Sequence, residues 1–154
     1  MPDWLTAYAT LKFVHVLLAI VAVGANATYG IWMARASRRP EILPQVLRTI
    51  RFLDDRVANP SYGLLLLTGL GLAWIGRLSL RTPWIVTGIV LYAIMAVLGI
   101  ALYRPALRKQ IDALDRHGFA SRPYRVAAAR GTAFGIATSI PAILIVAVMV
   151  LKPG

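Results

Sequence analysis

The chain has 154 residues, no cysteine and 58% hydrophobic residues, more than the roughly 45–50% found in soluble domains. Its net charge of +11 comes mainly from arginines between the apolar runs, a pattern typical of membrane-protein loops rather than of a nucleic-acid-binding surface. The absence of cysteine excludes disulfides, iron–sulfur clusters and thiolate metal sites. We therefore expect an all-α integral membrane protein whose main partner is the lipid bilayer, with no nucleic acid bound.

Four apolar runs reach the ~20 residues that cross a hydrocarbon core of ~30 Å. They cover residues 8–34, 57–76, 83–103 and 131–151. The first run is too long for a signal peptide and is expected to be retained as a span. Residues 1–154 are thus predicted to form a single transmembrane domain, a four-helix bundle. Basic residues concentrate in the connections 35–57 and 104–130, so both connections are expected in the cytoplasm, with both termini outside. The predicted location is the bacterial plasma (inner) membrane.

The first run has one face that carries nearly all of its polar side chains. At helical spacing this face reads Tyr8, Lys12, His15, Ala19, Ala22, Asn26, Tyr29 and Met33. A polar group that faces hydrocarbon costs a few kcal/mol, so the face should point into the bundle.

Both cytoplasmic connections show the apolar spacing of amphipathic helices. The first carries Ile42, Val46, Ile50, Leu53 and Val57, and the second carries Leu107, Ile111 and Leu114, ending at His117 and Gly118. We interpret both as helical extensions of the spans that anchor the bundle at the membrane interface. Asn59-Pro60 and Arg104-Pro105 predict a break or kink where the helices leave the membrane.

Small residues recur on one face of each later span, which predicts close helix packing in lipid. The packing glycines are Gly69, Gly76, Gly88, Gly99, Gly131 and Gly135. The short connection from Gly76 to Pro83 predicts that the second and third spans are antiparallel neighbours.

The sequence contains little that could carry catalysis. It shows no carboxylate at membrane depth, no nucleophile paired with a base, no phosphate-binding glycine loop and no cluster of zinc or di-iron ligands. A non-enzymatic role is therefore favoured. His15 remains, read either as a structural histidine or as an axial ligand of a b-type haem held between helices. Met149 lies at a similar depth and could supply the second ligand; water, Lys12 or no sixth ligand are alternatives.

The sequence resembles a family of predicted bacterial integral membrane proteins, domain of unknown function 2269. The resemblance rests on Leu11 to Leu17 with Gly24, on Arg51 to Arg56 with Asn59-Pro60, and on Leu67 to Leu70. That family is distantly similar to the copper-resistance protein D and protoporphyrinogen oxidase J membrane proteins, in which histidines are associated with haem. The likeness implies a haem role for His15 alone. The chain lacks a second intramembrane histidine, which excludes bis-histidine ligation.

Three functions follow as hypotheses. The first is a small haem-binding or redox-associated membrane protein built around His15. The second is a non-catalytic structural or accessory subunit that packs, through glycine faces, into a larger membrane complex or a homo-oligomer. The third is a binder of a small lipophilic or anionic ligand in a cavity lined by Tyr8, Lys12, His15, Asn26, Tyr29 and Tyr92.

Overall fold

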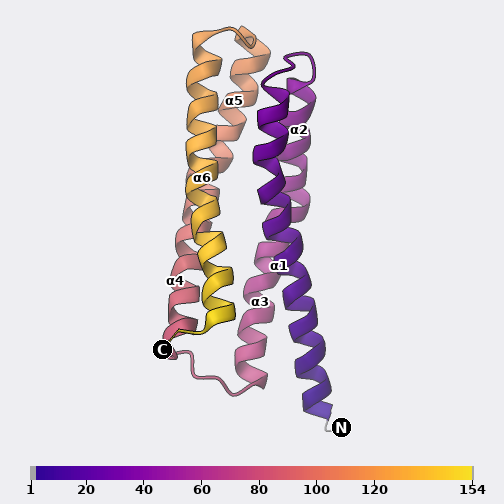
Figure 1. Cartoon of the computed structure of the whole chain (residues 1–154), viewed down its shortest axis with the longest axis vertical. Helices are drawn as coiled ribbons and strands as arrows, with labels where there is room; N and C mark the ends of the chain where they lie inside the picture. Colours follow the sequence, from indigo (N-terminus) through magenta and orange to yellow (C-terminus); the bar gives the residue numbers. More distant parts are fainter. Residues whose placement is uncertain (1–2, 154) are drawn as a thin grey trace.

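A computed structural model describes residues 3–153 and is almost entirely helical (Figure 1). The helices are α1 (Asp3–Ala36), α2 (Leu43–Leu53), the π-helix η1 (Asp54–Ala58), α3 (Asn59–Ile75), α4 (Pro83–Val97), the π-helix η2 (Leu98–Tyr103), α5 (Arg104–His117) and α6 (Arg122–Leu151). The predicted all-α fold is confirmed for this part of the chain.

These helices form four long rods, because α2, η1 and α3 follow one another without interruption, as do α4, η2 and α5. The rods pair into two hairpins. In the first hairpin, residues 3–75, α1 packs against α2, η1 and α3; in the second, residues 83–151, α4, η2 and α5 pack against α6. Figure 1 places the loops 37–42 and 118–121 at one end of the molecule, here the loop end. The two termini and the connection 76–82 lie at the other, terminal end.

Three of the described helices are long and apolar enough to cross a membrane: Trp4–Ala36, Pro83–His117 and Arg122–Leu151. They contain the predicted first, third and fourth spans. The second predicted span corresponds to α3, which has 17 residues and begins with the polar sequence Asn59 to Tyr62. Its length and composition leave it outside this set, so the fourth crossing stays a prediction at this point.

The prolines near the loop end do not break their helices, so the break predicted at Asn59-Pro60 is wrong, while the predicted kinks stay predictions. Asn59 N–H donates to the carbonyl of Asp54, and Arg104 N–H donates to the carbonyl of Gly99, each five residues back. A proline ring clashes with the carbonyl four residues before it, and the wider π-helical turn relieves that clash. Pro60 and Pro105 are therefore each accommodated by a π-helical turn, and both rods continue through them.

The predicted extension helices are confirmed, while their place relative to the membrane interface stays a prediction. They continue the rods along the molecular axis, and their apolar faces meet in a core at the loop end. This loop-end core consists of Tyr29, Ala36, Leu43, Leu47, Ile50, Leu107, Ile111, Leu114 and Tyr124. The predicted stripe of α5 is buried, whereas α2 is rotated from the prediction, so that Leu43 and Leu47 are fully buried and Ile42 and Val46 only partly.

The second and third spans are not packed against each other, contrary to the prediction from their short connection. No Cα atom of α3 lies within contact distance of α4; α3 packs on α1, and α4 packs on α6. The connection 76–82 has seven residues, which reach roughly 23 Å when extended, so it can join rods that stand apart.

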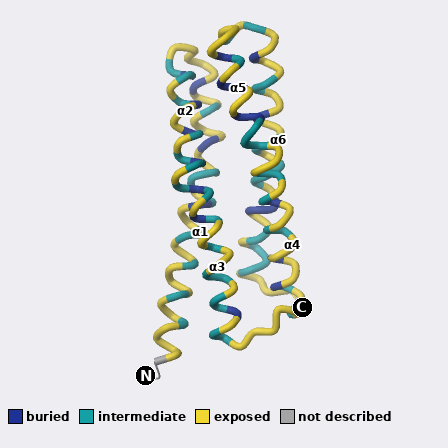
Figure 2. Tube along the Cα trace, turned by 180° about the vertical axis from the view of Figure 1, so that it is seen from behind, coloured by how far each residue is buried: buried dark blue, intermediate teal, exposed yellow. Residues whose placement is uncertain are grey.

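The polar face of α1 is the face that the bundle covers. Ala22 and Tyr29 are buried, and the other positions of the stripe are partly buried, except Lys12, which is exposed. Figure 2 shows buried positions gathered toward the loop end, with mostly exposed residues along the lower part of α1. The exposed residues there are apolar, for example Phe13 and Ile20, as expected of a surface in contact with lipid.

We expect Leu47→Ala to lower the stability of the fold by about 2–5 kcal/mol, because it leaves a cavity in the loop-end core. Leu67→Ala, on an exposed face of α3, should change stability far less. Thermal unfolding in detergent, followed by circular dichroism, measures both. Equal unfolding temperatures for the two variants would contradict a stabilising core at the loop end.

Candidate ligand site between the two hairpins

A cavity of about 990 Å³ lies between the two hairpins, from the loop end toward the middle of the rods. Apolar side chains such as Met33, Met95 and Ile143 form much of its wall. Its polar lining residues are Asn26, Tyr29, Ser37, Asp54, Asn59, Tyr62, Tyr92, Tyr103, Arg104, Gln110, Tyr124, Arg125, Thr132, Thr138 and Ser139. We call this space the interhairpin cavity. Its volume falls at the upper end of the range typical of sites for small molecules.

Three side chains close the polar network at the middle of the cavity. Asn26 Nδ2 donates to the hydroxyl of Tyr62 at 2.7 Å, and that hydroxyl donates to the carbonyl of Ala22 at 3.5 Å. Tyr92 of α4 reaches across to α3 and donates to the carbonyl of Tyr62 at 3.0 Å. These groups have partners within the protein, and the bond from Tyr92 links the two hairpins.

Tyr29 differs from its neighbours because its hydroxyl has no partner. Only 6% of the residue is exposed, and the hydroxyl is the one buried side-chain polar atom in the described part of the chain that forms no hydrogen bond. Buried hydroxyls in native proteins are nearly always paired, and an orphaned one costs about 1–3 kcal/mol. Tyr29 lines the cavity, so a bound molecule could supply the missing partner.

Asp54 brings a carboxyl group to the loop-side wall of the same cavity. It belongs to η1, is 7% exposed, and accepts a hydrogen bond from Asn59 Nδ2 at 3.1 Å. Burial raises the pKa of this carboxyl above its ordinary value, an effect that the hydrogen bond from Asn59 opposes. The group can therefore accept hydrogen bonds when ionised, or donate one when protonated.

An ion pair links the two π-helical turns across the hairpins. Arg104, which follows η2, pairs with Asp55 of η1, and Arg51 approaches the same carboxylate at 3.8 Å. Further toward the loops, Arg48 and Asp115 form a more exposed pair at 3.0 Å. The Arg104–Asp55 pair fixes the register of the hairpins next to Asp54.

His15 faces α3 rather than the cavity. Its Nδ1 lies 2.7 Å from the hydroxyl of Thr68, and that hydroxyl also lies within hydrogen-bonding distance of the carbonyls of Leu64 and Leu65. Tyr8 likewise lies against α3, close to Gly76, and Lys12 is exposed.

Met149 is turned toward a different helix from His15. Its terminal methyl lies against Gly88 of α4, and neither Met149 nor His15 lines the interhairpin cavity. The structure thus does not bring the two predicted haem ligands around a common space. The described residues also contain no group of three or more histidine, cysteine or acidic side chains placed to hold a metal ion. Haem ligation stays a prediction.

The six predicted packing glycines all face side chains of other helices in this chain. A Cβ built on each would meet His15 (Gly69), Tyr8 (Gly76), Met149 (Gly88), Thr138 (Gly99), Gln110 (Gly131) or Tyr103 (Gly135). The tightest fits are at Gly88, against the terminal methyl of Met149, and at Gly131, where the added Cβ would lie 2.6 Å from Gln110 Oε1. These glycines are used in packing within the bundle, and association with a larger complex stays a prediction.

Comparison with known proteins identifies the family. Residues 9–153 match the family model described as "Predicted integral membrane protein (DUF2269)". The chain belongs to this DUF2269 family. No curated protein and no solved structure matches it significantly.

In this DUF2269 protein, sequence analysis found part of the cavity and missed its loop-side wall. Asn26, Tyr29 and Tyr92 were predicted as lining residues and do line it, whereas Tyr8, Lys12 and His15 do not. Asp54, Asn59, Tyr62, Tyr103 and Arg104 were missed. The available signal was the placement of Tyr62 and Tyr103 on the same helical faces as the packing residues Gly69 and Gly99, which indicates tyrosines turned toward the bundle.

We expect the stability of the protein to depend on the ionisation of Asp54. The pKa of Asp54 is raised in the folded state, so at low pH the carboxyl is protonated in both states and its ionisation does not affect stability. As pH rises from ~4 toward the folded pKa, the unfolded chain loses this proton first, and the free energy of unfolding falls. Asp54→Asn should remove this part of the pH dependence, whereas Asp115→Asn, at an exposed site, should not. Thermal unfolding measured between pH ~4 and ~7 compares them. An unchanged pH profile in Asp54→Asn would contradict the burial argument.

The haem hypothesis for this DUF2269 protein has a spectroscopic test. If His15 ligates haem, protein made in haem-sufficient cells shows a Soret band that His15→Ala abolishes or shifts, and Met149→Leu alters the reduced spectrum. A Soret band unchanged in His15→Ala would exclude ligation by His15. Without any pigment, His15 is left as a structural group that joins α1 to Thr68.

Proposed function

We propose that this protein is a non-enzymatic membrane protein that binds a small amphipathic molecule in the interhairpin cavity. The observation that carries the proposal is the Tyr29 hydroxyl, which is buried, unpaired and on the wall of a cavity of about 990 Å³. The nearby groups of Asp54 and Tyr62 have hydrogen-bond partners in the protein, so the Tyr29 hydroxyl is a hydrogen-bonding position left for a ligand.

The lining defines the chemistry of the proposed ligand. The wall combines apolar side chains such as Met95 and Ile143 with polar groups, among which Tyr29, Asp54 and Tyr103 lie in or next to the loop-end core. A molecule with a lipophilic body and one compact polar head matches this combination. The head would exchange hydrogen bonds with the Tyr29 hydroxyl, and with Asp54 in either ionisation state. The guanidinium of Arg104 is already paired with Asp55, so beside Asp54 a neutral head fits better than an anionic one.

Two kinds of variant test the proposal: one places a bulky side chain in the cavity, and the other removes the Tyr29 hydroxyl. Ala96 lines the cavity, so Ala96→Trp should obstruct the part of it beside α4, whereas Val90→Trp places the same side chain on an exposed face of the same helix. Native mass spectrometry of protein titrated with monoolein, an apolar chain with a hydroxylated head, measures binding. We expect Ala96→Trp to abolish binding and Val90→Trp to retain it. Tyr29→Phe should weaken binding roughly fivefold through the loss of one hydrogen bond, and Tyr8→Phe should not. Equal binding by the wild type and Ala96→Trp would refute the proposal.

We also infer that α3 is a fourth membrane crossing. The chain passes along α1 to the loop end, and α4 starts at the terminal end, so the rod containing α3 has to return the chain between them. At 1.5 Å per residue, the 17 residues of α3 cover about 26 Å, close to the thickness of the hydrocarbon core. α3 also packs along α1, which is itself a candidate span.

Four crossings, with arginines concentrated at the loop end, support cytoplasmic loops and external termini in the plasma membrane of a bacterium. The chain has no cysteine, so single cysteines introduced at Ser37 and Ser79 are unique labelling sites. In intact cells, a membrane-impermeant thiol reagent should label the cysteine at position 79 and not the one at position 37. Labelling of both, or of position 37 alone, would contradict this topology.

A further inference from the structure

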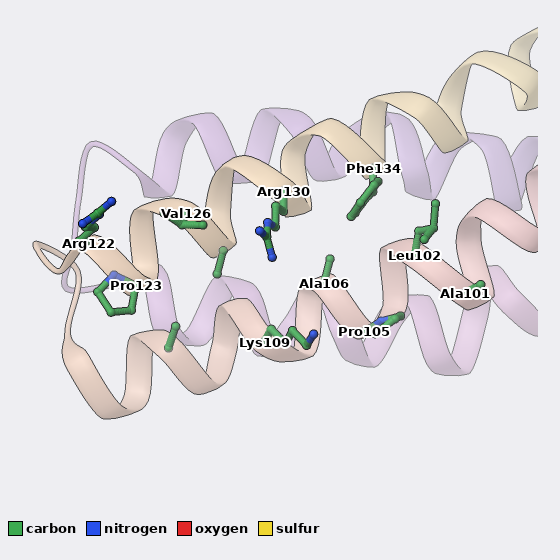
Figure 3. Close-up of a pocket in the computed structure, with 12 residues that line it drawn as sticks. Ala101, Leu102, Pro105, Ala106, Lys109, Arg122, Pro123, Val126, Arg130 and Phe134 are labelled. Atoms are coloured by element: carbon green, nitrogen blue, oxygen red, sulfur yellow. The ribbon is translucent and has the colours of Figure 1, made fainter.

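A second hollow lies outside the interhairpin cavity, in the second hairpin alone. It is a groove of about 630 Å³ between α5 and the first half of α6, and it reaches back to the last residues of η2 (Figure 3). Leu102, Pro105, Val126 and Phe134 give it an apolar lining. We call it the α5–α6 groove.

Basic side chains converge on this groove without acidic partners. Figure 3 shows Arg130 pointing from α6 across the groove toward α5, where Lys109 lies, with Arg122 near its loop end. Across the described residues, none of these three forms an ion pair, and the neighbouring Asp112 pairs with none of them. Like charges across a groove repel one another, so an anion between them would be held favourably.

The groove lies at a membrane interface. From Leu151 to Arg130, α6 covers 21 residues, which is about 32 Å and matches a hydrocarbon core of ~30 Å. Arg130 and Lys109 are thus level with the headgroups on the loop side, while Leu102 and Phe134 lie nearer the hydrocarbon.

We propose that the α5–α6 groove binds the headgroup of an anionic phospholipid. The phosphate lies between Lys109 and Arg130, and the first part of an acyl chain lies against Leu102 and Phe134. Basic grooves between membrane helices at an interface suit such headgroups. The apolar wall that continues toward the hydrocarbon selects a lipid over free phosphate. This site is separate from the interhairpin cavity and does not depend on its proposed ligand.

The test compares two double variants that remove equal charge. Lys109→Gln with Arg130→Gln removes the groove cations, while Arg38→Gln with Arg39→Gln removes two exposed cations from the loop of the first hairpin. Native mass spectrometry counts phosphatidylglycerol retained by each protein, with phosphatidylcholine as the neutral comparison. We expect the groove variant to lose roughly 25-fold in preference for phosphatidylglycerol, since each of the two basic residues contributes roughly fivefold near an anionic surface. The loop variant should keep the wild-type preference.

Equal losses in the two double variants would show general electrostatic attraction and overturn the proposal. Displacement of phosphatidylglycerol by millimolar inorganic phosphate would overturn it in favour of a free-anion site. If the groove variant lacks the wild-type circular dichroism spectrum, the single variants Lys109→Gln and Arg130→Gln carry the test, each expected to lose part of the preference. Lys109→Arg keeps the charge and should keep the preference.

Discussion

The loop-end core is the constraint on which the arrangement of the two hairpins depends. Within lipid, apolar side chains gain nothing by meeting each other rather than acyl chains, so the hydrophobic effect does not hold membrane helices together. At the loop end, where the extensions are predicted to lie outside the bilayer, Leu43, Leu47 and Ile50 meet Leu107, Ile111 and Leu114. The backbones of the hairpins contact each other only through α2 with α5 and α1 with α6, as far as the structure describes the chain. The hairpins are thus joined mainly from one end.

That one-ended joint explains the cavity. Toward the middle of the rods, α3 stays on α1 and α4 stays on α6, and the space between the pairs remains open. The two π-helical turns lie between the loop-end core and the interhairpin cavity, and the Arg104–Asp55 ion pair links them. An extra residue per turn changes which side chains face inward, and η1 contains the buried Asp54. Pro60 and Pro105, which would disrupt an ordinary α-helix, thus follow π-helical turns, and the turn before Pro60 contains Asp54 on the cavity wall.

Local rules predicted the helices well, because apolar spacing and run length are properties of short segments. The stripe of Leu107, Ile111 and Leu114 is buried as predicted, and α5 ends at His117 before Gly118 at φ 75°. The pairing of helices was predicted wrongly, since a short connection limits distance without specifying contact, and α3 and α4 stand apart. The cavity was only half found for the same reason: Asp54 and Tyr103 come together through the joining of two hairpins, which no spacing within one helix records. His15 was predicted as a candidate haem ligand from its place in the first apolar run. Its side chain contacts Thr68, 53 positions away in sequence, which no local pattern indicates.

The central claim is that two hairpins, joined at the loop end, enclose an occupied space beside Tyr29. A cryo-electron microscopy structure of the protein in native membrane lipid, at a resolution that shows side chains, tests it most directly. The account predicts α3 and α4 still apart, with elongated density between the hairpins whose head lies within hydrogen-bonding distance of the Tyr29 hydroxyl. Hairpins closed on each other with α3 against α4, or an empty space with Tyr29 bonded to a protein group, would contradict it.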